Sequence, residues 1–329
     1  MKIVFFNGTY EYWRYYLENA KVSYNVDLVF GRRVFVKSKL LKLAYKLHCS
    51  ERINKYLPLP LKHIWCDKMV PLKKNYPEKV TFIIYTSYLA YFPFDPGYFI
   101  NYLREYYNCR IALMYGNTVE SENRFFDGDT LCPMADLVCS YNTEDLGYYN
   151  LKIHPTLLFD LDIPMIPLKD REYDVFFIGQ EKGRGEEINQ IFKSLTKFGL
   201  KCEFYIVGKT EVPRLQGIHY SDWIPYSFVV EKLKQSKCIL NLLWEGSKGV
   251  TLRDIEAFNN GCFILKNYVD ESLYDLLPHE QVLTVENINQ ELASTIKSTD
   301  SAFQKKEEQK SFDVFYQWVI DNCWNKKID

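Results

Sequence analysis

The stretch from Gly249 to Cys262 carries charged groups whose types and spacing suit ligand chemistry. Apolar runs at 238–243 and 262–265 flank it, and each has the length of a buried parallel strand. Between them Leu252, Ile255 and Phe258 recur at the spacing of a helical face, and the residues 259–261, Asn-Asn-Gly, are a typical helix stop. The segment therefore predicts a strand, a loop, a short helix and a second strand.

A helix that begins at Gly249, Val250 and Thr251 would direct backbone N–H groups and the positive end of its dipole beyond the strand ends, where they suit a phosphate. Arg253 adds a cation, and Glu256, about one turn later, adds a carboxylate that accepts two hydroxyl hydrogen bonds. Together these groups would hold a nucleotide by its phosphate and ribose. The alternative is that they only cap and solvate an ordinary helix.

A second phosphate-binding arrangement is predicted upstream. The strand 173–179 ends in Gly179, and the loop after it carries Lys182 and Arg184 before a helix with an apolar face at 188–198. Trp223 and Tyr226 precede a further helix and offer aromatic faces, which contribute about 1–3 kcal/mol when they stack on a nucleobase. The alternatives are a tight turn with solvated charges and an aromatic loop anchor.

The series Gly249, Arg253, Glu256-Ala257 and Gly261 resembles the donor-binding motif of two-domain, GT-B type glycosyltransferases in the lipopolysaccharide, capsule and spore-coat branch. The resemblance implies that Glu256 binds the ribose of a nucleotide sugar and that the backbone of 249–251 contacts its diphosphate. It also implies a diphosphate contact from the basic loop 180–185 and a nucleobase position at 223–226.

One residue departs from the pattern. The larger retaining group of this superfamily has a second glutamate eight positions before the first, where this chain has Lys248. Lys248 is therefore kept as a donor-side candidate, while retention or inversion of configuration is not readable from the sequence.

The length of 329 residues suits two domains of ordinary size. We predict an α/β fold of two Rossmann-like domains that face each other across a cleft. Residues 1–160 would form an acceptor-side domain with a basic insertion at 32–74, and residues 161–310 a domain that binds the nucleotide sugar. Residues 311–329 would form a terminal helix that crosses back to the first domain, with an apolar face from Phe312 to Cys323.

Loops after strands of the first domain supply the acceptor-side candidates. Gly8 follows a strand at 1–6 and Asn117 follows a strand at 110–115, where ligands collect in open α/β sheets. Asp127 and Asp129 form an Asp-Gly-Asp triplet, which in another glycosyltransferase fold holds a metal on a diphosphate. In this loop context we favour an ordinary turn, and keep both aspartates as weak candidates for a catalytic base.

The segment 32–74 differs in composition from the rest of the chain. It holds twelve Lys and Arg residues against Glu51 and Asp67, a net charge of +10, in a protein whose net charge is −1. Leucines interleave with lysines at 39–47, which predicts a basic amphipathic helix suited to an anionic membrane surface. The alternative is a solvated insertion with a lysine-rich face. Nucleic acid is not expected as a partner, since no recognised nucleic-acid motif is present.

Nine cysteines without CxxC spacing, mostly in apolar runs, indicate reduced thiols, and the five histidines form no metal-ligand spacing. The first apolar run is too short for a signal peptide. We therefore expect a cytoplasmic location, peripheral to the inner face of the cell membrane, and no cofactor or metal, the nucleotide-diphosphate sugar being a substrate.

The resulting hypothesis is a glycosyltransferase that moves a hexosyl or related group, without a metal, from a nucleotide sugar to a saccharide or lipid-linked acceptor in cell-surface polysaccharide synthesis. The alternative is a non-catalytic nucleotide- or glycan-binding module on the same fold. A dinucleotide oxidoreductase fits less well, because no strand is followed by Gly-x-Gly-x-x-Gly. The sugar, the base, the acceptor and the oligomeric state are not encoded in any readable motif.

Overall fold

A computed structural model describes residues 1–8, 11–19, 22–30, 38–57, 59–90, 92, 94–155, 165–244, 248–303 and 312–325, with the backbone alone at 51 and 55. The chain divides into two compact units. The first comprises Met1–Leu17, Lys21–Leu157 and Lys310–Asp329, and the second comprises Glu18–Ala20 and Leu158–Gln309. The start of the predicted basic insertion, residues 32–37, lies outside the described residues.

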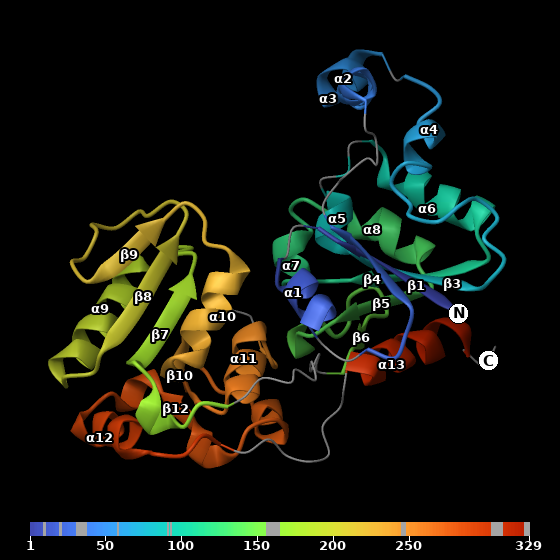
Figure 1. The fold of residues 1–329 in the computed structure, drawn as a ribbon. Coiled ribbons are helices and arrows are strands. Elements are labelled where there is room, and N and C mark those ends of the chain that lie inside the picture. The colour runs from blue at the N-terminus through green and yellow to red at the C-terminus, as the bar shows by residue number, and fades with distance from the viewer. Residues whose placement is uncertain are drawn as a thin grey trace. The chain divides into compact units, whose positions relative to one another are not determined.

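The first unit is built on a six-stranded parallel sheet (Figure 1). Its strands, in spatial order, are β2 (Val26–Phe30), β1 (Lys2–Asn7), β3 (Val80–Tyr85), β4 (Cys109–Met114), β5 (Leu137–Ser140) and β6 (Lys152–Ile153). Every residue of β1 and β3 is buried, because parallel strands are covered on both faces and therefore need continuous apolar runs.

Helices connect and cover these strands. They are α1 (Glu11–Asn19), α2 (Lys39–His48), α3 (Glu51–Tyr56), α4 (His63–Cys66), α5 (Thr86–Ala90), α6 (Pro96–Tyr106), α7 (Val119–Glu122), α8 (Gly128–Leu131) and α13 (Phe312–Trp324). The terminal helix α13 packs on β4 and β5 with its apolar face, from Phe312 to Cys323, buried as the periodicity predicts. None of the described helices is long and apolar enough to cross a bilayer.

The second unit holds another six-stranded parallel sheet. Its strands, in spatial order, are β12 (Val282–Thr284), β11 (Phe263–Lys266), β10 (Ser236–Asn241), β7 (Tyr173–Gly179), β8 (Cys202–Val207) and β9 (Ile218–Ser221). Its helices are α9 (Gly185–Lys197), α10 (Tyr226–Lys234), α11 (Leu252–Asn260) and α12 (Gln290–Ser298). If β7 is counted as the first strand, the spatial order of these six strands is the one found in doubly wound, dinucleotide-binding folds.

Candidate nucleotide-binding site

The carboxyl ends of β7 and β10 form the switch point of the second sheet. The two strands are neighbours, but the chain runs from β7 towards β9 on one side and from β10 towards β12 on the other. Ligands of open α/β sheets bind where the loops diverge at such a point. Here these are the loop 180–184, which leads into α9, and the described residues 242–244 and 248–251, which lie between β10 and α11.

The loop after β7 is shaped by two residues with left-handed backbone. Lys182 has φ of 47° and Gly183 has φ of 78°, and the glycine adopts this conformation at no steric cost. Gly179, the last residue of β7, lies against the Phe177 ring, to which an added Cβ would come within 3.2 Å. The loop therefore turns tightly before α9 begins at Gly185.

Arg184 joins the two loops of the switch point. Its Nη1 donates to the carbonyl of Leu242, just beyond β10, and its Nη2 donates to the carbonyl of Gln180 at 3.1 Å. The sequence predicts a diphosphate contact for Arg184, and in the structure this side chain ties the β7 loop to the residues that follow β10. Burial lowers the pKa of this guanidinium.

Lys182 adds a second positive charge beside Arg184. Desolvation of its amine, and after it the charge of Arg184, lower the pKa of Lys182. Two cations held side by side repel each other, and a bound anion would remove that repulsion. The Lys182 Nζ also lies 5.8 Å from the ring centre of Trp244, a half-exposed residue that sequence reasoning missed.

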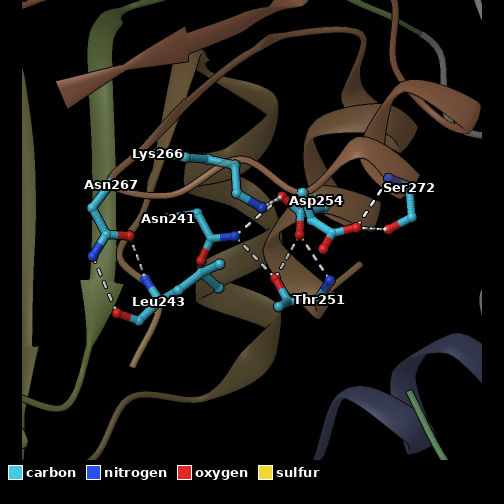
Figure 2. A network of polar contacts seen from close by, with 8 residues as sticks. Asn241, Leu243, Thr251, Asp254, Lys266, Asn267 and Ser272 are labelled. Atoms are coloured by element: carbon cyan, nitrogen blue, oxygen red, sulfur yellow. Dashed lines mark hydrogen bonds and ion pairs between the residues drawn. The ribbon is translucent and has the colours of Figure 1, made fainter. Parts of the chain in front are cut away.

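The start of α11 is fixed by a buried polar network (Figure 2). Thr251 is the N-cap and Asp254 completes a capping box, with the Thr251 N–H donating to Asp254 Oδ2 at 2.7 Å. Lys266 Nζ donates to Asp254 Oδ1 at 2.6 Å, and Asn241 Nδ2 donates to both Thr251 Oγ1 and Asp254 Oδ1. Asp254 thus takes the Thr251 N–H, so the diphosphate contact predicted from the backbone of 249–251 would have to use other N–H groups of this segment.

Other backbone donors remain at this helix start. Gly249 has φ of 90°, a conformation that favours glycine, and it turns the chain towards α11. Within the described residues, the N–H groups of Val250 and Leu252 donate no hydrogen bond. Lys248 Nζ lies 6.0 Å from the ring centre of Tyr268, which follows β11. Part of the predicted anion-binding helix start is thus available to a ligand.

Arg253 lies at the carboxyl end of β7. Its Nη2 donates to the carbonyl of Ile178 at 3.2 Å, and its Nη1 forms an ion pair with Glu256 Oε2. The other oxygen of Glu256 accepts a 2.7 Å hydrogen bond from the Tyr226 hydroxyl. The fully buried Glu256 carboxylate therefore orients Arg253. Because Glu256 is fully buried, a ribose hydroxyl would reach its carboxylate only if a neighbouring side chain moved.

Trp223 occupies a turn after β9. Its carbonyl accepts from the Ser221 hydroxyl at 2.8 Å, and its side chain is 62% exposed. Tyr226 begins α10 and is bonded to Glu256. The two aromatics therefore differ in role, since Trp223 offers an open face while the Tyr226 hydroxyl is engaged.

The acceptor-side candidates lie at the carboxyl edge of the first sheet. An added Cβ on Gly8 would come within 3.1 Å of Ser87 Oγ, so the loop after β1 closely approaches the residues after β3. Asn117 donates through both its backbone N–H and its Nδ2 to Glu122 Oε1. Burial raises the pKa of Glu122, which also accepts from Thr86. Glu122 was missed because nothing in its local sequence marks it as buried.

Asp127 and Asp129 are both exposed on the first unit. Asp127 is the N-cap of α8, and its carboxylate accepts from the Thr130 N–H at 3.2 Å. Asp127 therefore caps a one-turn helix at the place where the sequence favours an ordinary turn. Within the described ranges no group of three or more His, Cys, Asp and Glu side chains is placed to hold a metal ion.

Comparison with solved structures identifies the fold. An alpha-glucosyltransferase in complex with UDP and a 13-mer DNA with a central A:G mismatch matches 96% of this chain and 95% of its own, with 15% identity and a TM-score of 0.54. An alpha-glucosyltransferase in complex with UDP matches 98% and 96%, with 10% identity and a TM-score of 0.52. Neither a scan of protein-family models nor a search of curated proteins finds a match.

These structural neighbours are GT-B glycosyltransferases, and the two parallel sheets with alternating helices match them. The prediction of a two-domain, Rossmann-like α/β architecture is therefore confirmed. At these sequence identities the likeness concerns the fold, so the reaction has to be argued from the site itself.

Proposed function

We propose that the protein is a glycosyltransferase, which takes its sugar from a nucleotide-diphosphate donor bound by the second unit. The acceptor, a saccharide or a lipid-linked saccharide, binds the first unit. The motif that resembles the lipopolysaccharide, capsule and spore-coat branch supports a role in cell-surface polysaccharide synthesis.

One observation carries the donor assignment. Lys182 comes from the loop after β7, and Arg253 belongs to the first turn of α11, the helix that follows β10 at the same β7–β10 switch point. Guanidinium, ammonium and backbone N–H groups are the donors that proteins use for phosphate oxygens. The UDP in the two similar structures belongs to those proteins, and it makes uridine nucleotides the first donors to test.

In the proposed reaction the bond between the sugar's anomeric carbon and the diphosphate oxygen breaks, and a new bond forms to an acceptor hydroxyl oxygen. Negative charge grows on the leaving diphosphate, where Arg253 and Lys182 stabilise it. The proton of the acceptor hydroxyl passes to a base. Since these side chains supply positive charge, the proposal requires no metal, and we expect turnover to persist in the presence of EDTA.

A panel of nucleoside diphosphates and nucleotide sugars tests this function. We expect some of them to raise the thermal transition of the protein, and their sugars to be hydrolysed or transferred. Acceptors should include oligosaccharides, lipid-linked saccharides and duplex DNA, the last because a similar structure contains DNA. Stabilisation without turnover would favour the non-catalytic module, and a response to NAD alone would contradict both.

The variant Glu256→Ala is expected to weaken donor binding by about 1.5–3 kcal/mol, the usual worth of a hydrogen bond to a charged group. The loss arises because Arg253 then lacks the buried carboxylate that orients it. Isothermal titration with the best nucleotide of the panel measures the effect. Tyr226→Phe removes the other partner of Glu256 but keeps the Arg253 ion pair, so we expect a smaller loss. Unchanged affinity in Glu256→Ala would remove this residue from the site.

A further inference from the structure

The basic helix α2 is largely exposed in the part of the chain that the structure describes. None of its residues is buried, and in Figure 1 it projects together with α3 from the first unit. Leu40, Leu43 and Leu47 are 79%, 55% and 53% exposed. An amphipathic helix on a globular domain normally buries its apolar face, so this helix departs from the usual arrangement.

The face that anchors α2 is not its leucine face. Tyr45 makes an edge-on ring contact with Trp65, with ring centres 5.1 Å apart, and Trp65 Nε1 donates to His48 Nδ1 at 2.6 Å. Leu40, Leu43 and Leu47 follow the i, i+3, i+7 spacing of a different helical stripe. Tyr45 and His48 therefore hold the helix with its most apolar stripe directed to solvent.

A row of cations runs beside this stripe. Lys39, Lys42 and Lys46 also have the i, i+3, i+7 spacing, and each directly precedes one of the three leucines in the sequence. All three lysines are exposed. None of them forms an ion pair within the described part of the chain. The helix thus presents adjacent apolar and cationic stripes, the pattern of helices that lie in the interface of an anionic bilayer.

The size and composition of this surface distinguish a membrane from other partners. A ten-residue helix is about 15 Å long, and one face of it falls short of the roughly 800 Å² per partner of a stable protein interface. Exposed leucines contribute nothing to phosphate contacts on nucleic acid. Lipid offers both a hydrocarbon layer for the leucines and anionic headgroups for the lysines.

We propose that α2 binds the surface of an anionic lipid bilayer, with Leu40, Leu43 and Leu47 inserted at the acyl boundary and Lys39, Lys42 and Lys46 on the headgroups. This inference is independent of the donor site.

Vesicle flotation of the full chain tests the proposal. We expect binding to vesicles of phosphatidylcholine with about one third phosphatidylglycerol, and at least tenfold weaker binding to phosphatidylcholine alone. Replacement of the three lysines by glutamine should weaken binding to the anionic vesicles by about 100-fold, since each lysine near the surface is worth about fivefold. Replacement of Leu40, Leu43 and Leu47 by glutamine should weaken it at least tenfold.

The matched control replaces three exposed lysines of the second unit, Lys169, Lys193 and Lys197, by glutamine. It removes the same charge from the protein and should leave flotation unchanged. Because the replaced α2 side chains are exposed, the far-ultraviolet circular dichroism of all variants should match the parent. Equal losses in the control and the α2 lysine variant would overturn the proposal, as would binding of duplex DNA that depends on α2 without any flotation.

Discussion

The variant Lys266→Met is expected to destabilise the second unit by about 3–5 kcal/mol, the usual effect of removing one partner of a buried ion pair. Lys266 and Asp254 are almost fully buried, with their side chains 1% and 0% exposed. Without the ammonium group, the Asp254 carboxylate would keep Asn241 and Thr251 as partners but remain an uncompensated buried charge.

Amide hydrogen exchange by mass spectrometry is the suitable measurement, because the two units need not unfold together. Peptides that cover β10 and β11 should lose protection, while those of β1 and β3 should not change. Lys201→Met is the matched control, since its ion pair with Glu172 is exposed and worth about 1 kcal/mol or less.

The double variant Asp254→Asn with Lys266→Met should recover part of the lost stability, because it removes both buried charges. If Lys266→Met reduced hydrogen-exchange protection no more than Lys201→Met, the network around Asp254 would not hold the start of α11.

The variant Arg253→Ala is expected to reduce kcat/KM for sugar transfer by about 100-fold to 1000-fold, the range found when one preorganised donor to a developing negative charge is removed. Arg253 is held at the end of β7 by the Ile178 carbonyl and by Glu256, so its guanidinium needs little rearrangement to meet a diphosphate. Steady-state kinetics with the donor found in the panel measures the change.

Loss of folding has to be separated from loss of the cation. Arg253→Ala leaves Glu256 buried with one hydrogen bond, whereas the double variant Arg253→Ala with Glu256→Gln carries no unpaired charge. We expect this double variant to fold normally and still to lack activity. Arg253→Lys keeps the positive charge but lacks the planar guanidinium group. We therefore expect its kcat/KM to lie between that of the parent and that of Arg253→Ala. If Arg253→Ala kept kcat/KM within about threefold of the parent, Arg253 would play no part in charge stabilisation.

Much of the fold could be predicted because its buried strands are continuous apolar runs. The predicted boundaries of β7 agree with the structure, and those of β10 and β11 differ by one or two residues. Short strands at or near the sheet edges were missed. β6 is Lys152–Ile153 and β9 is Ile218–Ser221, and neither is long enough to show a period. After β5 the chain forms a single 3₁₀ turn, Thr143–Asp145, and the Asp145 carboxylate accepts from the Ser140 hydroxyl and from the Val119 N–H.

The candidate site was predicted at the level of segments and less well at the level of atoms. The loops after β7 and β10 were identified from their glycines and cations, and the topology places them at one switch point. The sequence could not show that Arg184 bonds to the Leu242 carbonyl, nor that Asp254 takes the Thr251 N–H. Both cases depend on which polar groups meet after folding.

The sequence by itself determined two α/β domains, the place of α11 between two buried strands, and the presence of cations around it, because apolar periodicity and glycine positions are local properties of the chain. Only the tertiary structure decided which of those charges pair with other groups of the protein. Lys266 finds Asp254, and Glu256 finds Tyr226 thirty residues away, because a buried charge must be paired wherever the fold brings a partner. The same reason leaves the lysines of α2 at the surface, where water solvates them and no partner is required.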